Sequence, residues 1–223
     1  MSELFSIQLQ NQQQSRDGVW LDLPTTTEQV QAALRQIGIS SDNPQGLFIS
    51  GYFAEEEKRF AISYNMVLAS NVDELNFLAS RLETLSTGER AELNAALQAP
   101  QSELFSIGRI TDFPENVDYY VHLPDVHGPA QLGDYYLNRS GMVNMPEEWR
   151  GGIDTAQFGR YVAQQEQGVF TEYGYLVKSG DEWQKVHEGQ PVPEEYRVLS
   201  FPAPEVLRDS ANIPPPVDRK SVV

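Results

Sequence analysis

The sequence predicts an α+β protein, a chain of small α+β and helical domains with short antiparallel sheets. Near the N-terminus, short segments of strand-forming residues are separated by a polar run, as in a hairpin. After residue 66 the apolar residues recur at intervals of three and four, as in helices. Hydrophobic residues make up 40% of the 223 residues, which is enough to fill real cores. We expect an N-terminal α+β domain at 1–66, a helical hairpin domain at 67–101, an acidic C-terminal α+β domain at 102–202 and a flexible proline-rich tail at 203–223.

The first domain is expected to combine three strands with one helix. Residues 4–9 form a strand candidate, and residues 18–23 are its expected hairpin partner, ended by Pro24. Thr26 or Thr27 can cap a helix that continues to Ile37, where Gly38 stops it. Residues 47–53 then predict a third strand.

The second domain is expected to be a pair of helices joined by a short turn. Asn71 or Asp73 can cap a first helix, whose apolar side chains fall on one face. Ser86 and Glu89 have the spacing of a capping box, which predicts a second helix over residues 91–97, ended by Pro100.

The third domain mixes extended and helical segments. Residues 104–110 and 118–123 look extended, whereas residues 130–138 and 153–165 look helical. Residues 168–177 predict a strand pair or a strand with a bulge. The tail, with three successive prolines at 214–216, lacks periodicity and suits a flexible or docking arm.

A short internal echo is visible at an offset of 100 residues. Residues 2–7 (SELFSI) recur at 102–107, and the Leu-Pro pair at 23–24 recurs at 123–124. Two interpretations are open: two related strand–strand–Leu-Pro–helix units, or chance similarity between short apolar segments.

The charge balance restricts the partners. The chain has 32 acidic and 16 basic residues, for a formal net charge of −16. Residues 70–172 contain 16 acidic and 6 basic residues, so they account for −10 of that charge. Because nucleic acids and anionic membranes repel such a surface, we expect no direct nucleic-acid or membrane binding and instead a basic protein partner.

The sequence shows no targeting signal and contains no cysteine. The first thirty residues are polar and Gln-rich, unlike a signal peptide, and no apolar stretch approaches the roughly 20 residues of a membrane span. Zero cysteines exclude disulfides, thiolate zinc sites and cysteine nucleophiles. The expected location is the cytoplasm.

Catalytic and metal-binding patterns are weak. His122 and His127 lie near Asp125, so a His/Asp metal cluster is one interpretation, but a turn after a strand explains this spacing equally well. The sequence contains no G-x-S-x-G, P-loop or G-x-G-x-x-G motif. We therefore expect a protein that is not an enzyme and needs no cofactor or metal, with a carboxylate- or His-dependent hydrolase as the competing class.

The acidic residues are the better candidates for function. Sixteen net charges correspond to roughly 27 Å of duplex DNA, or about eight base pairs, and a dimer would double this length. A DNA mimic is thus one interpretation, and a solvated face that aids solubility is the other. The candidate phosphate-mimicking acids are Asp73, Glu74, Glu83, Glu89, Glu92, Asp112, Glu115, Asp118, Asp125, Asp134, Glu147, Glu148, Asp154, Glu166 and Glu172.

Four sequence blocks, in order along the chain, resemble the ArdA antirestriction family of conjugative plasmids and transposons. The blocks are GVWLDLP at 18–24, DELNFLA at 73–79, LGDYY at 132–136, and a last block formed by ID at 153–154, FGR at 158–160 and GVFTEYGYL at 168–176. The resemblance implies an elongated dimer whose acidic surface imitates bent B-form DNA in the DNA groove of type I restriction–modification enzymes. It also implies a role in evasion of host defence by mobile genetic elements, in the cytoplasm of a bacterial host cell.

The chain departs from the family pattern in its Gln-rich opening at 10–14 and in its proline-rich tail. These departures leave the target open, and another nucleic-acid-binding defence complex, such as a CRISPR effector, would need the same surface. A third interpretation is an acidic adaptor that recruits basic proteins through the tail.

Overall fold

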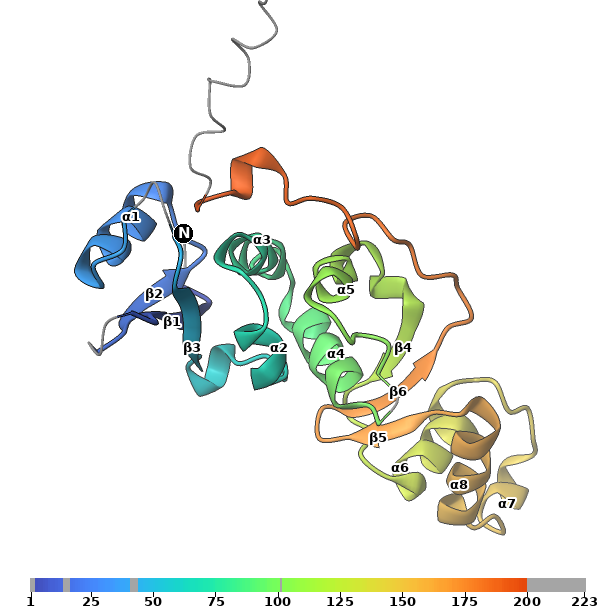
Figure 1. The fold of residues 1–223 in the computed structure, drawn as a ribbon. Helices are drawn as coiled ribbons and strands as arrows, with labels where there is room; N and C mark the ends of the chain where they lie inside the picture. The colour runs from blue at the N-terminus through green and yellow to red at the C-terminus, as the bar shows by residue number, and fades with distance from the viewer. Residues whose placement is uncertain (1–2, 14–16, 41–43, 101, 200–223) are drawn as a thin grey trace, which may run out of the picture.

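The computed structural model describes residues 3–13, 17–40, 44–100 and 102–199, so the proline-rich tail lies outside the described residues. Two three-stranded antiparallel sheets are separated along the chain by a group of helices, which confirms the α+β class. Figure 1 shows the first sheet at one end, the helices of residues 64–111 in the middle, and a lobe formed by the helices of residues 129–166 at the other end.

The first sheet has the strand order β2-β1-β3 and carries one helix on its apolar face. Ile7 and Leu9 of β1 are fully buried, as is Leu23 of β2, and they pack with Val30 and Leu34 of the helix. The sequence predicted all four elements within two residues at each end. Their bounds are β1 (Phe5–Asn11), β2 (Val19–Leu23), α1 (Thr27–Gln36) and β3 (Leu47–Phe53).

The middle of the molecule contains the two predicted long helices and two further short helices. Asn71 and Ser86 begin the two long helices, and each has a complete capping box with the glutamate three residues on. The sequence did not predict α2, which spans the expected domain boundary at residue 66. The helices are α2 (Tyr64–Leu68), α3 (Val72–Leu82), α4 (Thr87–Gln98) and α5 (Ile107–Thr111).

The prediction of an extended segment at 104–110 was wrong, because residues 107–111 form α5. Ser106 caps this helix by accepting a hydrogen bond from the Arg109 N–H at 3.2 Å. Ile107 and Ile110 fall on one face and are buried in the larger core. The spacing of three between these residues outweighs the β-propensity of the segment.

The internal echo does not correspond to two equivalent units. Residues 4–7 lead into and lie in β1, whereas the matching residues 104–107 lead into a helix. Only the Leu-Pro pairs are alike, since in each the leucine is the last residue of a strand and the proline follows it. The structure therefore favours chance similarity over two repeated strand–strand–Leu-Pro–helix units.

The second sheet joins a strand from the middle of the chain to a later hairpin, in the order β4-β6-β5. Gly174 begins β6 with φ +120°, a conformation that suits glycine at this tight turn. The predicted strand pair at 168–177 is thereby confirmed. The strands are β4 (Tyr120–Leu123), β5 (Val169–Thr171) and β6 (Gly174–Lys178).

A small lobe beside this sheet is built on a close crossing of two helices, which confirms the helices predicted at 130–138 and 153–165. A Cβ added to Gly133 would lie 1.9 Å from the Thr155 carbonyl oxygen, and one added to Gly159 would lie 1.8 Å from that of Pro129. The helices can approach this closely only because both positions lack a side chain. The elements of the lobe are α6 (Pro129–Asp134), a π-helical turn (Tyr135–Arg139), α7 (Glu147–Arg150) and α8 (Thr155–Glu166).

We expect Gly159→Ala to destabilise the protein by about 3 kcal/mol, because backbone atoms of α6 must move to admit the methyl group. Urea unfolding followed by circular dichroism measures the loss. The matched control is Gly88→Ala in α4, where no atom lies within 4 Å of the added Cβ. The control should be neutral or slightly stabilising. Equal destabilisation of both variants would contradict the role assigned to the crossing.

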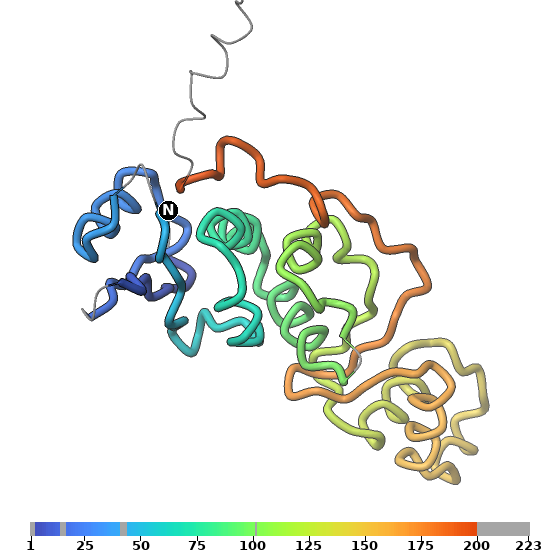
Figure 2. The backbone as a smooth tube through the Cα atoms, in the orientation of Figure 1, coloured from blue at the N-terminus to red at the C-terminus, as the bar shows by residue number. Residues whose placement is uncertain are grey.

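Residues 179–199, which we call the strap, run back along the outside of the molecule from the second sheet past α5 and α3 (Figures 1 and 2). The strap contains one 3-10 turn, Glu194–Tyr196, and is otherwise irregular. Val198 near its end is buried in the larger core, which also takes in Leu4 from the start of the chain. The remaining 3-10 turns are Glu56–Lys58, Phe113–Glu115 and Val117–Tyr119.

Candidate functional site

The candidate acids differ widely in exposure. Asp112 is fully buried. A second group is half-buried: Asp73, Glu74, Glu83, Glu89, Glu92, Asp134 and Glu166. A third group is exposed, and we call these residues the exposed acids: Glu115, Asp118, Asp125, Glu147, Glu148, Asp154 and Glu172.

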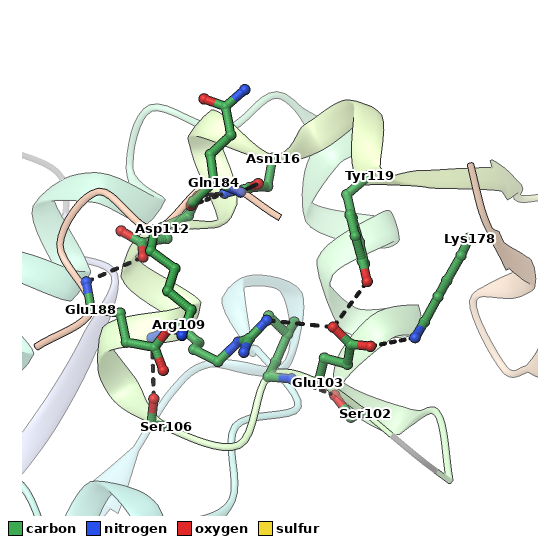
Figure 3. A network of polar contacts seen from close by, with 12 residues as sticks. Ser102, Glu103, Ser106, Arg109, Asp112, Asn116, Tyr119, Lys178, Gln184 and Glu188 are labelled. Carbon is green, nitrogen blue, oxygen red and sulfur yellow. Dashed lines mark hydrogen bonds and ion pairs between the residues drawn. The ribbon is translucent and has the colours of Figure 1, made fainter. Parts of the chain in front are cut away.

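Asp112 was predicted to be a surface acid, and its burial shows that this prediction was wrong. Its side chain has 0% relative exposure and binds the strap (Figure 3). Oδ1 accepts a hydrogen bond from the His187 N–H at 2.6 Å, and Oδ2 accepts one from the Glu188 N–H at 3.2 Å. A carboxylate enclosed in this way cannot contact a partner protein, so Asp112 has a structural role.

Two half-buried acids are also engaged within the fold. Asp73 Oδ1 accepts hydrogen bonds from the backbone N–H groups of Val198 and Leu199, each at 2.7 Å. Glu166 accepts hydrogen bonds from the hydroxyls of Tyr136 at 2.6 Å and Tyr175 at 3.0 Å. Burial, followed by the nearby carboxylate, raises the pKa of both tyrosines. These acids mainly stabilise the strap and the small lobe.

Three acids belong to helix N-termini. Glu74 and Glu89 complete the capping boxes of α3 and α4, and Asp154 caps α8 by accepting from the N–H groups of Ala156 and Gln157. The hydrogen bonds from Ser86 hold the pKa of Glu89 below its ordinary value. A carboxylate at this position also interacts favourably with the helix dipole. Capping therefore explains the presence of these acids without any partner.

Other candidates have a neighbour that partly neutralises or holds them. Glu115 forms an ion pair with Arg81, and Asp134 forms one with Arg139 at 3.2 Å. Glu172 accepts a hydrogen bond from Gln98. Glu83 is half-buried at the C-terminal end of α3. Exposed ion pairs are weak, so a partner's arginine can still compete for these carboxylates.

Glu92 on α4 stands in an unfavourable environment. Burial, and then the carboxylates of Glu89 and Asp118, raise the pKa of Glu92 from 4.5 to about 8. Its Oε1 is enclosed and has no hydrogen-bond partner among the described residues. The protein thus holds a proton on this side chain at neutral pH.

We expect Glu92→Gln to stabilise the protein by about 1–2 kcal/mol above pH 8, a value reduced for the part of the side chain that solvent screens. Because the folded-state pKa is raised, the cost of Glu92 is absent below pH 4.5, grows as the pH rises and is complete above about pH 8. Urea unfolding at several pH values measures this slope. Glu148→Gln, at an exposed position, should leave the dependence of the unfolding free energy on pH unchanged. If Glu92→Gln also left that dependence unchanged, the raised pKa assigned to Glu92 would be contradicted.

Four of the exposed acids are not engaged by any hydrogen bond or ion pair within the part of the chain that the structure describes. We call Asp118, Asp125, Glu147 and Glu148 the unpaired acids. Asp118 lies in the 3-10 turn before β4, and Asp125 follows that strand. Glu147 and Glu148 form the first turn of α7. Their carboxylates are the candidate acids most available to a basic partner.

The sequence analysis overlooked Glu103, whose side chain joins residues of three elements (Figure 3). It accepts a hydrogen bond from the Tyr119 hydroxyl at 2.9 Å and forms ion pairs with Arg109, at 3.4 Å, and with Lys178. The hydrogen bond from Lys178 is the main cause that lowers the pKa of Glu103. Its partners are 6 to 75 residues away along the chain. No local pattern could have revealed this convergence.

The histidine interpretation gains no support from the arrangement of the side chains. His122 Nε2 lies 2.8 Å from the Tyr173 carbonyl oxygen across the second sheet, and the exposed His127 lies in the turn after β4. Across the described ranges, no three His, Cys, Asp or Glu side chains gather as a metal site would require. In the same ranges, none of the helices has the length and apolar character to cross a membrane.

Comparison with known families identifies the chain's relatives. A model of the antirestriction protein family ArdA matches residues 13–177, more than half of the sequence. The chain belongs to the ArdA family. Membership confirms the predicted family and implies antirestriction, the inhibition of restriction enzymes. No curated protein matches the sequence.

The structure explains some of the blocks that make this ArdA chain recognisable. Gly133 and Gly159 are the two close-contact residues of the α6–α8 crossing, and Gly174 makes the turn of the β5–β6 hairpin. Asp73 ties α3 to the strap. These residues of the blocks therefore support the fold of this chain, whereas the unpaired acids lie between or beside the blocks. The strap beyond residue 178 and the proline-rich tail lie outside the matched range.

Proposed function

We propose that this ArdA protein is a DNA mimic that inhibits type I restriction–modification enzymes by occupying their DNA-binding groove with an acidic surface. The observation that carries the proposal is the coincidence of family and charge: the match at 13–177 includes the whole of residues 70–172, where the net charge is −10. The exposed acids act as phosphate surrogates in this proposal.

The chemistry of the exposed acids suits this role. A DNA groove offers arginines and lysines placed to meet phosphates, and carboxylates at similar spacing form charge-assisted hydrogen bonds with the same side chains. A surface that imitates charge and shape presents no base edges. Inhibition is therefore expected to be independent of the DNA sequence that the target enzyme recognises.

The proposed mode of action needs no catalytic group and no cofactor. The protein acts in the bacterial cytoplasm as a homodimer, binds no nucleic acid itself and serves a mobile element in evading restriction. The lack of nucleic-acid binding follows from the net charge of −16, whereas the dimer, the location and the role in evasion are what the resemblance to the ArdA family implies.

A displacement assay tests the proposal. A labelled duplex is bound to the purified methyltransferase core of a type I enzyme, and the ArdA protein is titrated into the mixture. Stoichiometric displacement, without binding of the protein to the free duplex, is expected. If the duplex stays bound, the type I target is wrong, and the same titration with a CRISPR effector then tests the alternative class of target.

A further inference from the structure

The groove beside the strap has the shape and lining to hold an extended proline-rich segment. It encloses about 750 Å³ between α2, α3, the start of α5 and residues 187–192. Phe77 forms one side of the groove and is fixed edge-on against His187, with ring centroids 4.9 Å apart. Phe105 lies on another side and keeps 65% of its surface exposed. Grooves lined by aromatic side chains are the usual docking sites of proline-rich segments.

The groove continues to Leu199, four residues before the tail. A second hollow of about 340 Å³ shares Glu74, Pro191 and Val192 with the first, and Leu199 lines it. Leu199 is the last described residue before the tail. A segment that follows Leu199 therefore starts at one end of the hollow and does not need to cross the molecule to enter the groove.

The tail has the matching chemistry. Ile213 to Val217 is an apolar run around three prolines, and Asp218 separates it from two bases, Arg219 and Lys220. The carboxylates of Glu74 and Glu188 line the groove. The 14 residues that follow Leu199, as far as Ile213, span about 20 Å as a coil and about 43 Å as polyproline II, so reach does not limit docking.

We propose that the proline-rich tail of this chain docks in the groove between α2, α3, α5 and the strap of the same molecule. The prolines lie against Phe105 and Phe77, and Arg219 and Lys220 face the carboxylates at the groove. Because the tail is tethered at Leu199, its effective concentration is in the millimolar range, which allows a weak contact to be occupied. Docking leaves the unpaired acids uncovered, since none of them lines the groove.

The lack of cysteine makes a direct test possible. In the full-length protein, Ser221→Cys carries a nitroxide label, and amide signals are recorded on uniformly ¹⁵N-labelled protein. We expect Gly108 and Gly189, which line the groove, to lose most of their signal intensity. Gly151 and Gly152 in the small lobe should keep theirs. Uniform intensities, or broadening away from the groove, would overturn the proposal.

Two variants and a mixing experiment identify the contact and the occupant. Phe105→Ala should restore the intensities of Gly108 and Gly189, whereas Phe53→Ala, at a similarly exposed phenylalanine outside the groove, should not. Replacing the three prolines at 214–216 by serine, which keeps length and charge, should also restore them. In a mixing experiment, spin-labelled protein without ¹⁵N is combined with ¹⁵N-labelled protein that carries no spin label. Broadening of the groove signals in this mixture would assign the groove to the tail of a second copy and overturn docking within one molecule.

Discussion

Neutralising the four unpaired acids together, as Asp118→Asn, Asp125→Asn, Glu147→Gln and Glu148→Gln, is expected to weaken displacement of the duplex by about 30-fold to 1000-fold. Each exposed contact with a partner's arginine or lysine contributes about 0.5–1 kcal/mol, so four contacts contribute about 2–4 kcal/mol. Single changes should each have an effect of less than about tenfold for the same reason. The measurement is the concentration of inhibitor that displaces half of the bound duplex from the methyltransferase core.

A matched control separates the effect of the unpaired acids on binding from the effect of overall net charge. The control variant changes four exposed glutamates outside residues 70–172 to glutamine and so removes the same number of charges. These residues are Glu55, Glu56, Glu57 and Glu182. The control variant should displace the duplex nearly as well as the unaltered protein. If both fourfold variants lost displacement equally, net charge alone would drive binding. If a single substitution such as Asp125→Asn abolished activity, a catalytic or metal site would be favoured instead.

Much of the fold could be predicted because its signals are local. Thr26, Asn71 and Ser86 begin helices through capping contacts that span three residues, and the sequence contains both partners of each contact. The strands of the first sheet were likewise visible from short apolar segments bounded by turns. The error at 104–110 arose where the local signals conflict: the residues suit a strand, but Ser106 and the spacing of Ile107 and Ile110 suit a helix.

The site was harder to predict because the availability of an acid depends on distant residues. Asp112 and Asp118 look alike in sequence, yet one is enclosed by residues 187–188 and the other is exposed. Glu103 was overlooked for the same reason, since Lys178 reaches it from 75 residues away. Charge density along the chain therefore predicted where acids gather, but not which of them remain free for a partner.

Asp112→Ala is expected to lower the free energy of unfolding by about 3–5 kcal/mol. The carboxylate accepts one hydrogen bond on each oxygen, from the N–H groups of His187 and Glu188, and hydrogen bonds to a charged group contribute about 1.5–3 kcal/mol each. Removing it also leaves two backbone donors of the strap without their acceptor. Asn116 holds the same part of the strap at Gln184, so we expect loosening of the strap and not complete loss of the fold.

Two readouts distinguish this structural role from a role in partner binding. Urea unfolding gives the loss of stability, and amide hydrogen exchange should show faster exchange at His187 and Glu188 in the folded variant. Asp118→Ala, six residues further on at an exposed position, should change neither quantity. Conversely, the folded Asp112→Ala protein should displace the duplex as well as the unaltered protein, because a fully buried carboxylate contributes no contact to a partner. A variant with unchanged stability and weakened displacement would return Asp112 to the binding surface, in contradiction to its position in the structure.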